Sequence, residues 1–93
     1  MAGLADLYEW SDAKRSANLA KHGVDFAAIL DFDWTKASVV ADARRDYGEA
    51  RLIAFGRIDG RLHVLVFTRR RGKVRIISLR KANKAEVAFH ERS

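Results

Sequence analysis

The segment RLIAFGRIDGRLHVLVFT, residues 51–68, decides the fold. Its two mostly apolar runs, Arg51 to Ile58 and Arg61 to Thr68, flank the dipeptide Asp59-Gly60. Runs of this length and composition are typical of strands, and Asp-Gly between them favours a type I′ hairpin turn. The segment therefore predicts an antiparallel hairpin in which Ile58 lies opposite Arg61 and Arg51 lies opposite Thr68.

On the C-terminal side the chain continues the sheet. Residues 69–73 predict a basic turn, and Val74 to Arg80 predict another strand. If residues 70–73 form the loop, Thr68 also lies opposite Arg75. Asn83 and Glu86 have the spacing of a capping box, which predicts a C-terminal helix.

On the N-terminal side the pattern changes to helices. A short strand is expected from Leu7 to Glu9, followed by a helix that Ser11 caps and that ends at His22. Trp10 is placed to pack against its first turn, and Gly23 suits the left-handed C-cap. Asp25 can cap a second, shorter helix carrying Phe26, Ile29 and Leu30.

These segments predict one α+β domain covering residues 1–93. Ser38 to Asp42 add a short strand, and residues 43–48 form a charged loop. The expected order is β-α-α-β-β-β-β-α, with an antiparallel sheet at the centre. A chain of 93 residues is long enough for one hydrophobic core and too short for two.

The hairpins also place side chains on two faces. One face has Arg51, Thr68 and Arg75 in a row at its end, and we expect helices to cover it as the core. The opposite face is too apolar to lie bare in water, so we expect cover from the last helix or a partner. A one-residue slip would exchange the faces of the last strand. The first face carries Ile53, Phe55, Val64, Val66, Ile77 and Leu79, and the second carries Leu52, Leu65, Phe67, Ile76, Gly56, His63, Ser78 and Arg80.

The charge balance favours a polyanionic partner. The chain has 18 Lys and Arg against 12 Asp and Glu, a formal net charge of +6. Such a surface suits nucleic acid, an acidic membrane or an acidic protein, although it can also serve only solubility. The chain has no Cys and three widely separated His residues, so we expect neither metal nor other cofactor. No run approaches the roughly 18 apolar residues of a membrane span, and the start MAGLADLYEW lacks signal-peptide features, which predicts a cytoplasmic location.

The densest functional signal is basic. Arg75 and Arg80 lie within an apolar strand, where a charge is costly unless it is paired or used. They either bind phosphate or form structural salt bridges. The remaining cations of the segment form a phosphate-binding surface or a solvated turn. The segment from Arg69 to Lys84 contains Arg69, Arg70, Arg71, Lys73, Arg75, Arg80, Lys81 and Lys84.

Proton transfer has two candidates. His22 ends the first helix, where it either caps the helix or exchanges a proton with RNA near neutral pH. It shares a helix face with Lys14, Asn18 and Lys21. Glu49 can act as a base or form an ion pair with an Arg, and the mid-strand His63 is expected to be structural.

None of the common enzyme motifs is present. RNA cleavage demands little, because the ribose supplies its own 2′-oxygen nucleophile. The protein must align the phosphate, neutralise developing charge and manage two proton transfers. A few Arg and Lys residues with one His or Glu satisfy this without metal.

Motifs spread over residues 8–90 carry a family resemblance. They are Tyr8-Glu9-Trp10, Lys14, Asn18, Lys21-His22-Gly23-Val24 and Phe26; then Gly48-Glu49, Arg51, Gly56 and Thr68; and finally Arg75-Ile76-Ile77-Ser78-Leu79-Arg80-Lys81-Ala82 with Glu86. Together they resemble the BrnT toxins. Ser11 stands where the family usually has Asp, and His90 where it often has Tyr.

The resemblance implies a RelE-like ribonuclease toxin of a type II toxin–antitoxin pair that halts translation. It implies a BrnA-like antitoxin with a ribbon-helix-helix part, forming a hetero-oligomer that binds operator DNA and represses its own operon. The catalytic candidates are Arg80, Arg75, His22 and Glu49, and the RNA-binding candidates are Arg51, Arg70, Lys81 and Lys14. The alternatives are a nucleic-acid-binding module without catalysis and a protein-interaction module.

Overall fold

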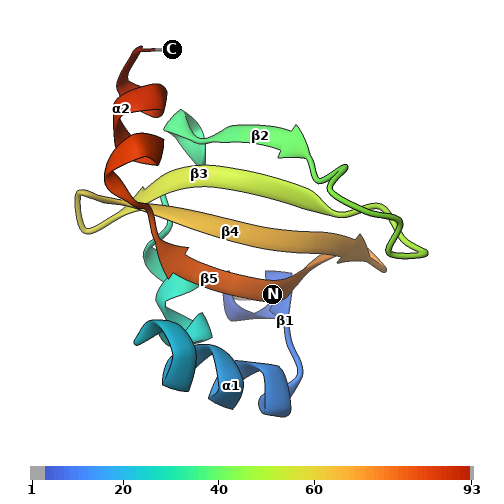
Figure 1. The fold of residues 1–93 in the computed structure, drawn as a ribbon. Coiled ribbons are helices and arrows are strands. Elements are labelled where there is room, and N and C mark those ends of the chain that lie inside the picture. Colours follow the sequence, from blue (N-terminus) through green and yellow to red (C-terminus); the bar gives the residue numbers. More distant parts are fainter. Residues whose placement is uncertain (1–3, 93) are drawn as a thin grey trace.

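The computed structural model describes residues 4–92, and Figure 1 shows its α+β architecture. The N-terminal segment MAGLADLYEW was expected not to be a signal peptide. Its residues 1–3 lie outside the described range. Two α-helices and three short 3₁₀ helices (η) accompany the strands in the described part of the chain. The elements are η1 (Leu4–Leu7), β1 (Tyr8–Glu9), α1 (Asp12–His22), η2 (Phe26–Asp31), η3 (Trp34–Lys36), β2 (Ser38–Ala41), β3 (Leu52–Ile58), β4 (Arg61–Arg70), β5 (Lys73–Lys81) and α2 (Lys84–Arg92).

The described strands form one five-stranded sheet in the order β1-β5-β4-β3-β2. Neighbours from β2 to β5 are antiparallel, as predicted, but β1 pairs with β5 in parallel. The antiparallel sheet expected at the centre is present, and β1 adds a parallel pair at its edge, so the whole sheet is mixed. The chain between β1 and the rest of the sheet includes α1 and the 3₁₀ helices, which is long enough for the crossover that a parallel pair requires.

Both long hairpins turn through two residues. Ile58 pairs with Arg61, and the residues between them, Asp59 and Gly60, have positive φ of 49° and 79°. Two successive residues of positive φ define a type I′ turn, so this prediction is confirmed. The same geometry recurs where Arg70 pairs with Lys73, which makes β4 and β5 longer than predicted.

A β-bulge changes the register between β4 and β5. Thr68 pairs with Arg75, as expected, and Phe67 pairs with Ile76. The register then shifts, so that Val66 pairs with Ser78 and Val64 with Arg80. Ile77 is the extra residue. The predicted faces of Ile77 to Arg80 were consequently wrong, because the bulge moves Ser78 and Arg80 to the face of Val64 and Val66.

The face assignment of the main core was also wrong. Helix η2 covers the face we name the inner face, which carries Leu65, Phe67, Ile76 and Leu79, while α1 lies along β5 at the edge of the sheet. Phe26 and Ile29 of η2 are fully buried against it. Gly56 lies on the same face. The Phe32 ring occupies the space where a Cβ of residue 56 would be, so only glycine fits there. Both faces are apolar, so the alternation alone could not tell which one the helices cover.

The other face, here the outer face, carries Ile53, Phe55, Val64 and Val66 and is covered in part by α2. Figure 1 shows α2 beyond one end of the sheet, on the side away from α1. A second core cluster joins Leu62 and Val64 to Ala82 and Val87. The last helix therefore does cover a sheet face, but it is the face that was predicted to be the main core.

Capping residues set the helix ends as the sequence predicts. The backbone N–H of Lys14 donates to Ser11 Oγ (3.3 Å), and Gly23 closes α1 with a φ of 71°. Asn83 and Glu86 form the reciprocal capping box of α2. The second helix, η2, has Asp25 as its N-cap but is 3₁₀ rather than α-helical.

Candidate active site

A cavity of about 450 Å³ opens on the outer face. Its floor is the apolar centre of the sheet, and its walls are polar and mostly cationic. The walls come from the end of α1, the loop after β2, the end of β5 and the first turn of α2. The lining residues are Lys21, His22, Arg44, Ile53, Phe55, Val64, Val66, Ser78, Arg80 and Glu86.

Arg80 enters this cavity held by Glu86. Its Nη1 and Nη2 atoms donate to the two carboxylate oxygens of Glu86, each at 2.8 Å. Glu86 also accepts from the backbone N–H of Asn83 (2.9 Å), which ties the ion pair to the start of α2. This hydrogen-bonded pair raises the pKa of Arg80 and lowers the pKa of Glu86. Arg80 is thus a fixed cation whose side chain remains about one third exposed (34%).

Asn18 fixes α1 to β5 and thereby positions His22, the last residue of the helix. The Asn18 amide donates to the carbonyl oxygens of Leu79 (2.7 Å) and Val24 (2.9 Å), and its Oδ1 accepts from Leu79 N–H (3.1 Å). The side chain thereby takes the place of a neighbouring strand along β5, beyond the two residues that β1 pairs. Because α1 is fixed at the sheet edge, its last residues reach the outer face.

The surroundings of His22 lower the pKa of its imidazole. Burial, followed by the charges of Lys21 and Arg80, lowers the pKa of His22 from its usual 6.5. Each of these effects disfavours the imidazolium form. The ring is therefore mainly neutral at pH 7 and able to accept a proton.

Arg44 completes the cationic wall. Its guanidinium donates to both carboxylate oxygens of Asp42, through Nε and Nη2, each at 2.7 Å. The Asp42 side chain is fully buried, and the hydrogen bond from Arg44 lowers its pKa to about 2. Asp42 therefore anchors Arg44, whose side chain is 64% exposed.

A second cationic group lies at the other end of the outer face. Arg51 stacks on the Tyr47 ring, with Cζ 4.1 Å from the centroid, and its Nε lies 3.5 Å from a Glu49 oxygen. Arg51 Nε is buried and, within residues 4–92, has no hydrogen-bond partner. Glu49 also accepts from Arg70 Nη2 (2.8 Å), which lowers the pKa of its carboxyl. Arg75 donates to Glu9 (2.9 Å).

The candidates from the sequence thus separate into two groups. Arg80 and His22 share the cavity, whereas Arg75 and Glu49 lie near Arg51 and Arg70 at the far end of the strands. Thr68, opposite Arg75, is four residues along β4 from Val64, opposite Arg80. At the usual strand rise this separates the two Arg residues by about 13 Å. Lys14 lines a shallow hollow with Lys21 and His22, and Lys81 is exposed at the end of β5.

A sequence profile identifies the family of the chain. The profile described as "Ribonuclease toxin, BrnT, of type II toxin-antitoxin system" matches residues 10–86. The chain belongs to this family. The resemblance inferred from the motifs is therefore confirmed, and a toxin of a type II pair implies an antitoxin as its partner. No curated protein matches the sequence.

Some cavity residues of this BrnT-family toxin were missed as functional candidates. Arg44 lay in a stretch interpreted only as a charged loop, Ser78 was assigned to the wrong face, and Glu86 was assigned only a capping role. The closing motif Arg75 to Ala82 with Glu86 contains two of the three, so it was a usable signal. The sequence contains no such signal for Arg44, because only the folded loop brings it to the cavity.

Within residues 4–92, no three His, Asp or Glu side chains are close enough together to hold a metal ion. Of the helices described, none is sufficiently long and apolar to cross a membrane.

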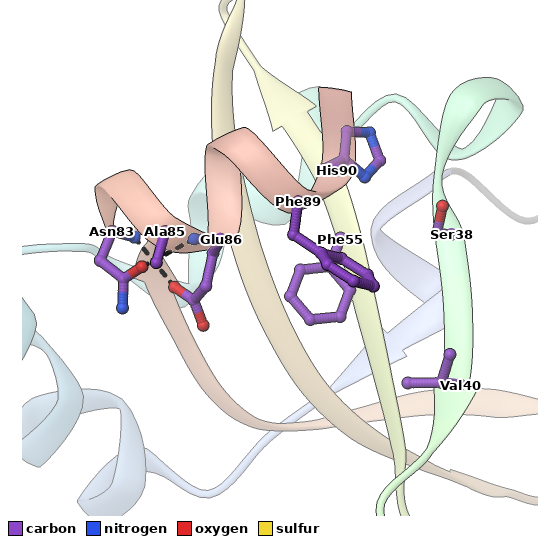
Figure 2. A pocket seen from close by; sticks show the side chains of 8 residues that line it. All are labelled: Ser38, Val40, Phe55, Asn83, Ala85, Glu86, Phe89 and His90. Atoms are coloured by element: carbon purple, nitrogen blue, oxygen red, sulfur yellow. Dashed lines mark hydrogen bonds between the residues drawn. The ribbon is translucent and has the colours of Figure 1, made fainter. Parts of the chain in front are cut away.

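Beside the cavity lies an apolar groove of about 440 Å³ between α2 and β2 (Figure 2). Phe55 and Glu86 line both hollows, so the groove and the cavity lie next to each other. Phe89 of α2 is 68% exposed at its side.

Proposed function

We propose that this BrnT-family toxin is a metal-independent endoribonuclease that binds the scissile phosphate of RNA at Arg80. The observation that carries the proposal is the shared cavity of Arg80, Lys21, Arg44 and a His22 whose pKa is lowered. Arg binds phosphate through a planar fork of two N–H donors, and the neighbouring cations add further charge.

The cleavage step follows from these groups. The 2′-hydroxyl of the ribose loses its proton to His22, and its oxygen attacks the adjacent phosphorus. The bond from phosphorus to the 5′-oxygen then breaks, that oxygen takes the proton back from the His22 imidazolium, and a 2′,3′-cyclic phosphate is left. Arg80 stabilises the additional negative charge on the phosphoryl oxygens during the attack. Lys21 and Arg44 also stabilise that negative charge. Every group that takes part in the step therefore belongs to the protein or to the RNA.

Arg51, Arg75 and Arg70 are proposed to hold the RNA beyond the cavity. Arg75 lies about 13 Å along the sheet from Arg80, and Arg51 and Arg70 lie at the same end of the outer face as Arg75. Lys14 and Lys81 extend the cationic surface at the other side. Glu49 is the second candidate for proton transfer, but its pairing with Arg70 and Arg51 favours a role in orienting those cations.

The finer family properties are proposed as well. We infer a RelE-like fold, inhibition of translation in the cytoplasm, and a BrnA-like ribbon-helix-helix antitoxin whose complex with the toxin binds operator DNA. The basic outer face of the sheet supports RNA as the substrate, and the same face suits an antitoxin that blocks it.

The test uses Arg80→Ala, Arg80→Lys and the control Arg61→Ala, which removes an exposed charge outside the cavity. We expect wild type and Arg61→Ala to cleave RNA in EDTA and to arrest bacterial growth. Arg80→Ala should cleave at least about 100-fold more slowly, because a transition-state donor is lost. Arg80→Lys should be intermediate, since it keeps the charge without the fork.

The rates are measured by gel analysis of a labelled RNA, with circular dichroism as the folding check. A folded Arg80→Ala that cleaves at the wild-type rate would remove Arg80 from the site. A wild type that binds RNA without cleaving it would instead indicate a binding module, and cleavage that EDTA abolishes would overturn metal independence.

A further inference from the structure

We propose that the apolar groove between β2 and α2 is a nucleobase subsite, which holds one base of single-stranded RNA beside the phosphate bound at Arg80. The inference rests on the proposed ribonuclease function. It adds a base-binding groove that selects the position at which the RNA is cleaved.

The groove has the composition of a base-binding site. Phe55 of β3 and Phe89 of α2 point into it in Figure 2, with Val40 of β2 on the opposite wall. Ser38 and His90 stand at its rim. A hydroxyl and an imidazole can each donate and accept hydrogen bonds, which is what the edge of a base requires. Single-stranded RNA is bound largely by bases that stack on aromatic rings.

Its position relative to Arg80 follows from the strand register. Arg80 pairs with Val64, Val64 pairs with Phe55, and Phe55 pairs with Ser38, so these residues form one row across the outer face. At the usual strand spacing, the Cα atoms of Arg80 and Phe55 lie about 10 Å apart. The Arg80 side chain shortens that span from one end. A single nucleotide, with its phosphate at Arg80 and its base at Phe55, fits such a separation.

The charges of the neighbourhood favour RNA over an apolar protein segment as the occupant. The groove adjoins a cavity walled by Lys21, Arg44 and Arg80. Glu86, at the boundary between the two, is bound at both carboxylate oxygens by Arg80, so the charges of this pair offset each other and the excess positive charge lining the cavity comes from Lys21 and Arg44. A ligand that spans both hollows therefore needs an anionic end and a flat apolar end, as a nucleotide has.

The experiment measures binding of a short, labelled 2′-O-methyl RNA, which cannot be cleaved because its nucleophile is blocked. An abasic residue is moved through the oligonucleotide one position at a time. For the wild type, we expect one position to weaken binding by about fivefold to a hundredfold, which corresponds to the loss of one stacked base. Phe89→Ala should weaken binding of the intact oligonucleotide similarly, and the two losses should not multiply.

Two variants accompany this measurement. Phe89→Tyr should retain binding because it retains the ring, and Leu30→Ala, which removes an exposed apolar side chain from η2, should bind as wild type does. Phe89 is exposed, so Phe89→Ala should keep the wild-type circular dichroism spectrum.

Each contrary outcome has its own meaning. Equal binding at every abasic position, or losses that multiply with Phe89→Ala, would overturn the subsite while leaving cleavage at Arg80 intact. If Phe89→Ala binds RNA normally but the antitoxin no longer neutralises it in cells, the groove is a protein-docking site and the proposal is wrong. A wild type that does not bind the RNA would overturn the ribonuclease proposal together with the subsite.

Discussion

One extra residue in β5 determines where Arg80 lies. If pairing continued regularly beyond Phe67 and Ile76, Leu79 would face outward, and Arg80 would lie on the inner face among buried apolar side chains. A charge there would be desolvated at a cost of several kcal/mol. The bulge at Ile77 instead buries Leu79 fully and gives Arg80 a partner in Glu86. The bulge is therefore the local feature that creates the cavity.

At the same scale, His22 predicts the pH dependence of cleavage. A base must be neutral to accept a proton, so the single-turnover rate should rise with pH and level off above the pKa of His22. That pKa is lowered from 6.5, which places the midpoint on the acidic side of this value. Lys21→Ala removes one cause of the shift and should move the midpoint to higher pH.

Lys14→Ala is the matched control, since Lys14 lies on the same helix but does not contribute to the shift. It should leave the midpoint where it is in the wild type. An unchanged midpoint in Lys21→Ala, or an unchanged pH profile in His22→Gln, would show that another group accepts the proton.

At the scale of elements, α1 is joined to the sheet through Asn18. This residue is buried and forms three hydrogen bonds, two with β5 and one with the residue after Gly23. Asn18→Ala should lower the free energy of unfolding by about 3 kcal/mol, because buried backbone groups lose their partners. Urea denaturation measures this loss. The variant should also lose RNA cleavage at temperatures where it remains folded, since His22 is no longer held at the cavity.

Asn83→Ala provides the control for this prediction. Asn83 is exposed and caps α2 through a single side-chain acceptor, so its loss should cost about 1 kcal/mol. If the two variants lose similar free energies of unfolding, Asn18 contributes no more to stability than a helix cap at the surface does.

At the scale of the whole molecule, three of the cationic residues proposed to bind RNA lie on the face that η2 leaves uncovered. Arg51, Arg75 and Arg80 all lie on the outer face, at two ends of the same strands. Such a surface binds an RNA strand through several phosphates at once, and binding of this kind releases counterions.

Salt dependence tests this arrangement. The logarithm of the binding constant for a 2′-O-methyl RNA should fall linearly with the logarithm of salt concentration. Arg75→Ala should reduce the slope by about 0.7, the value for one phosphate contact on a single strand. Lys36→Ala removes an exposed charge from η3, which packs on the inner side through Trp34, and should leave the slope unchanged. A wild-type slope in Arg75→Ala would exclude Arg75 from the RNA contacts.

The sequence by itself determined the features that depend on neighbouring residues. The Asp59-Gly60 turn, the caps at Ser11 and Gly23, and the Asn83–Glu86 box are set by local backbone preferences and short-range hydrogen bonds, and all are present. The family motifs also identified the toxin, because they record particular side chains rather than a fold. Arg80, His22 and Lys21, which line the cavity, were singled out from the sequence, and their roles remain proposals.

Only the tertiary structure decided which face of the sheet is buried, how β1 pairs, and which cations share a cavity. Both faces of β3 and β4 are apolar, so burial depends on the helices that pack there and not on the alternation. The bulge at Ile77 responds to the cost of burying Arg80, which exists only once the sheet has formed. Arg44 reaches the cavity because Asp42 is buried beside it. These outcomes depend on contacts between residues far apart in the chain, which no local pattern encodes.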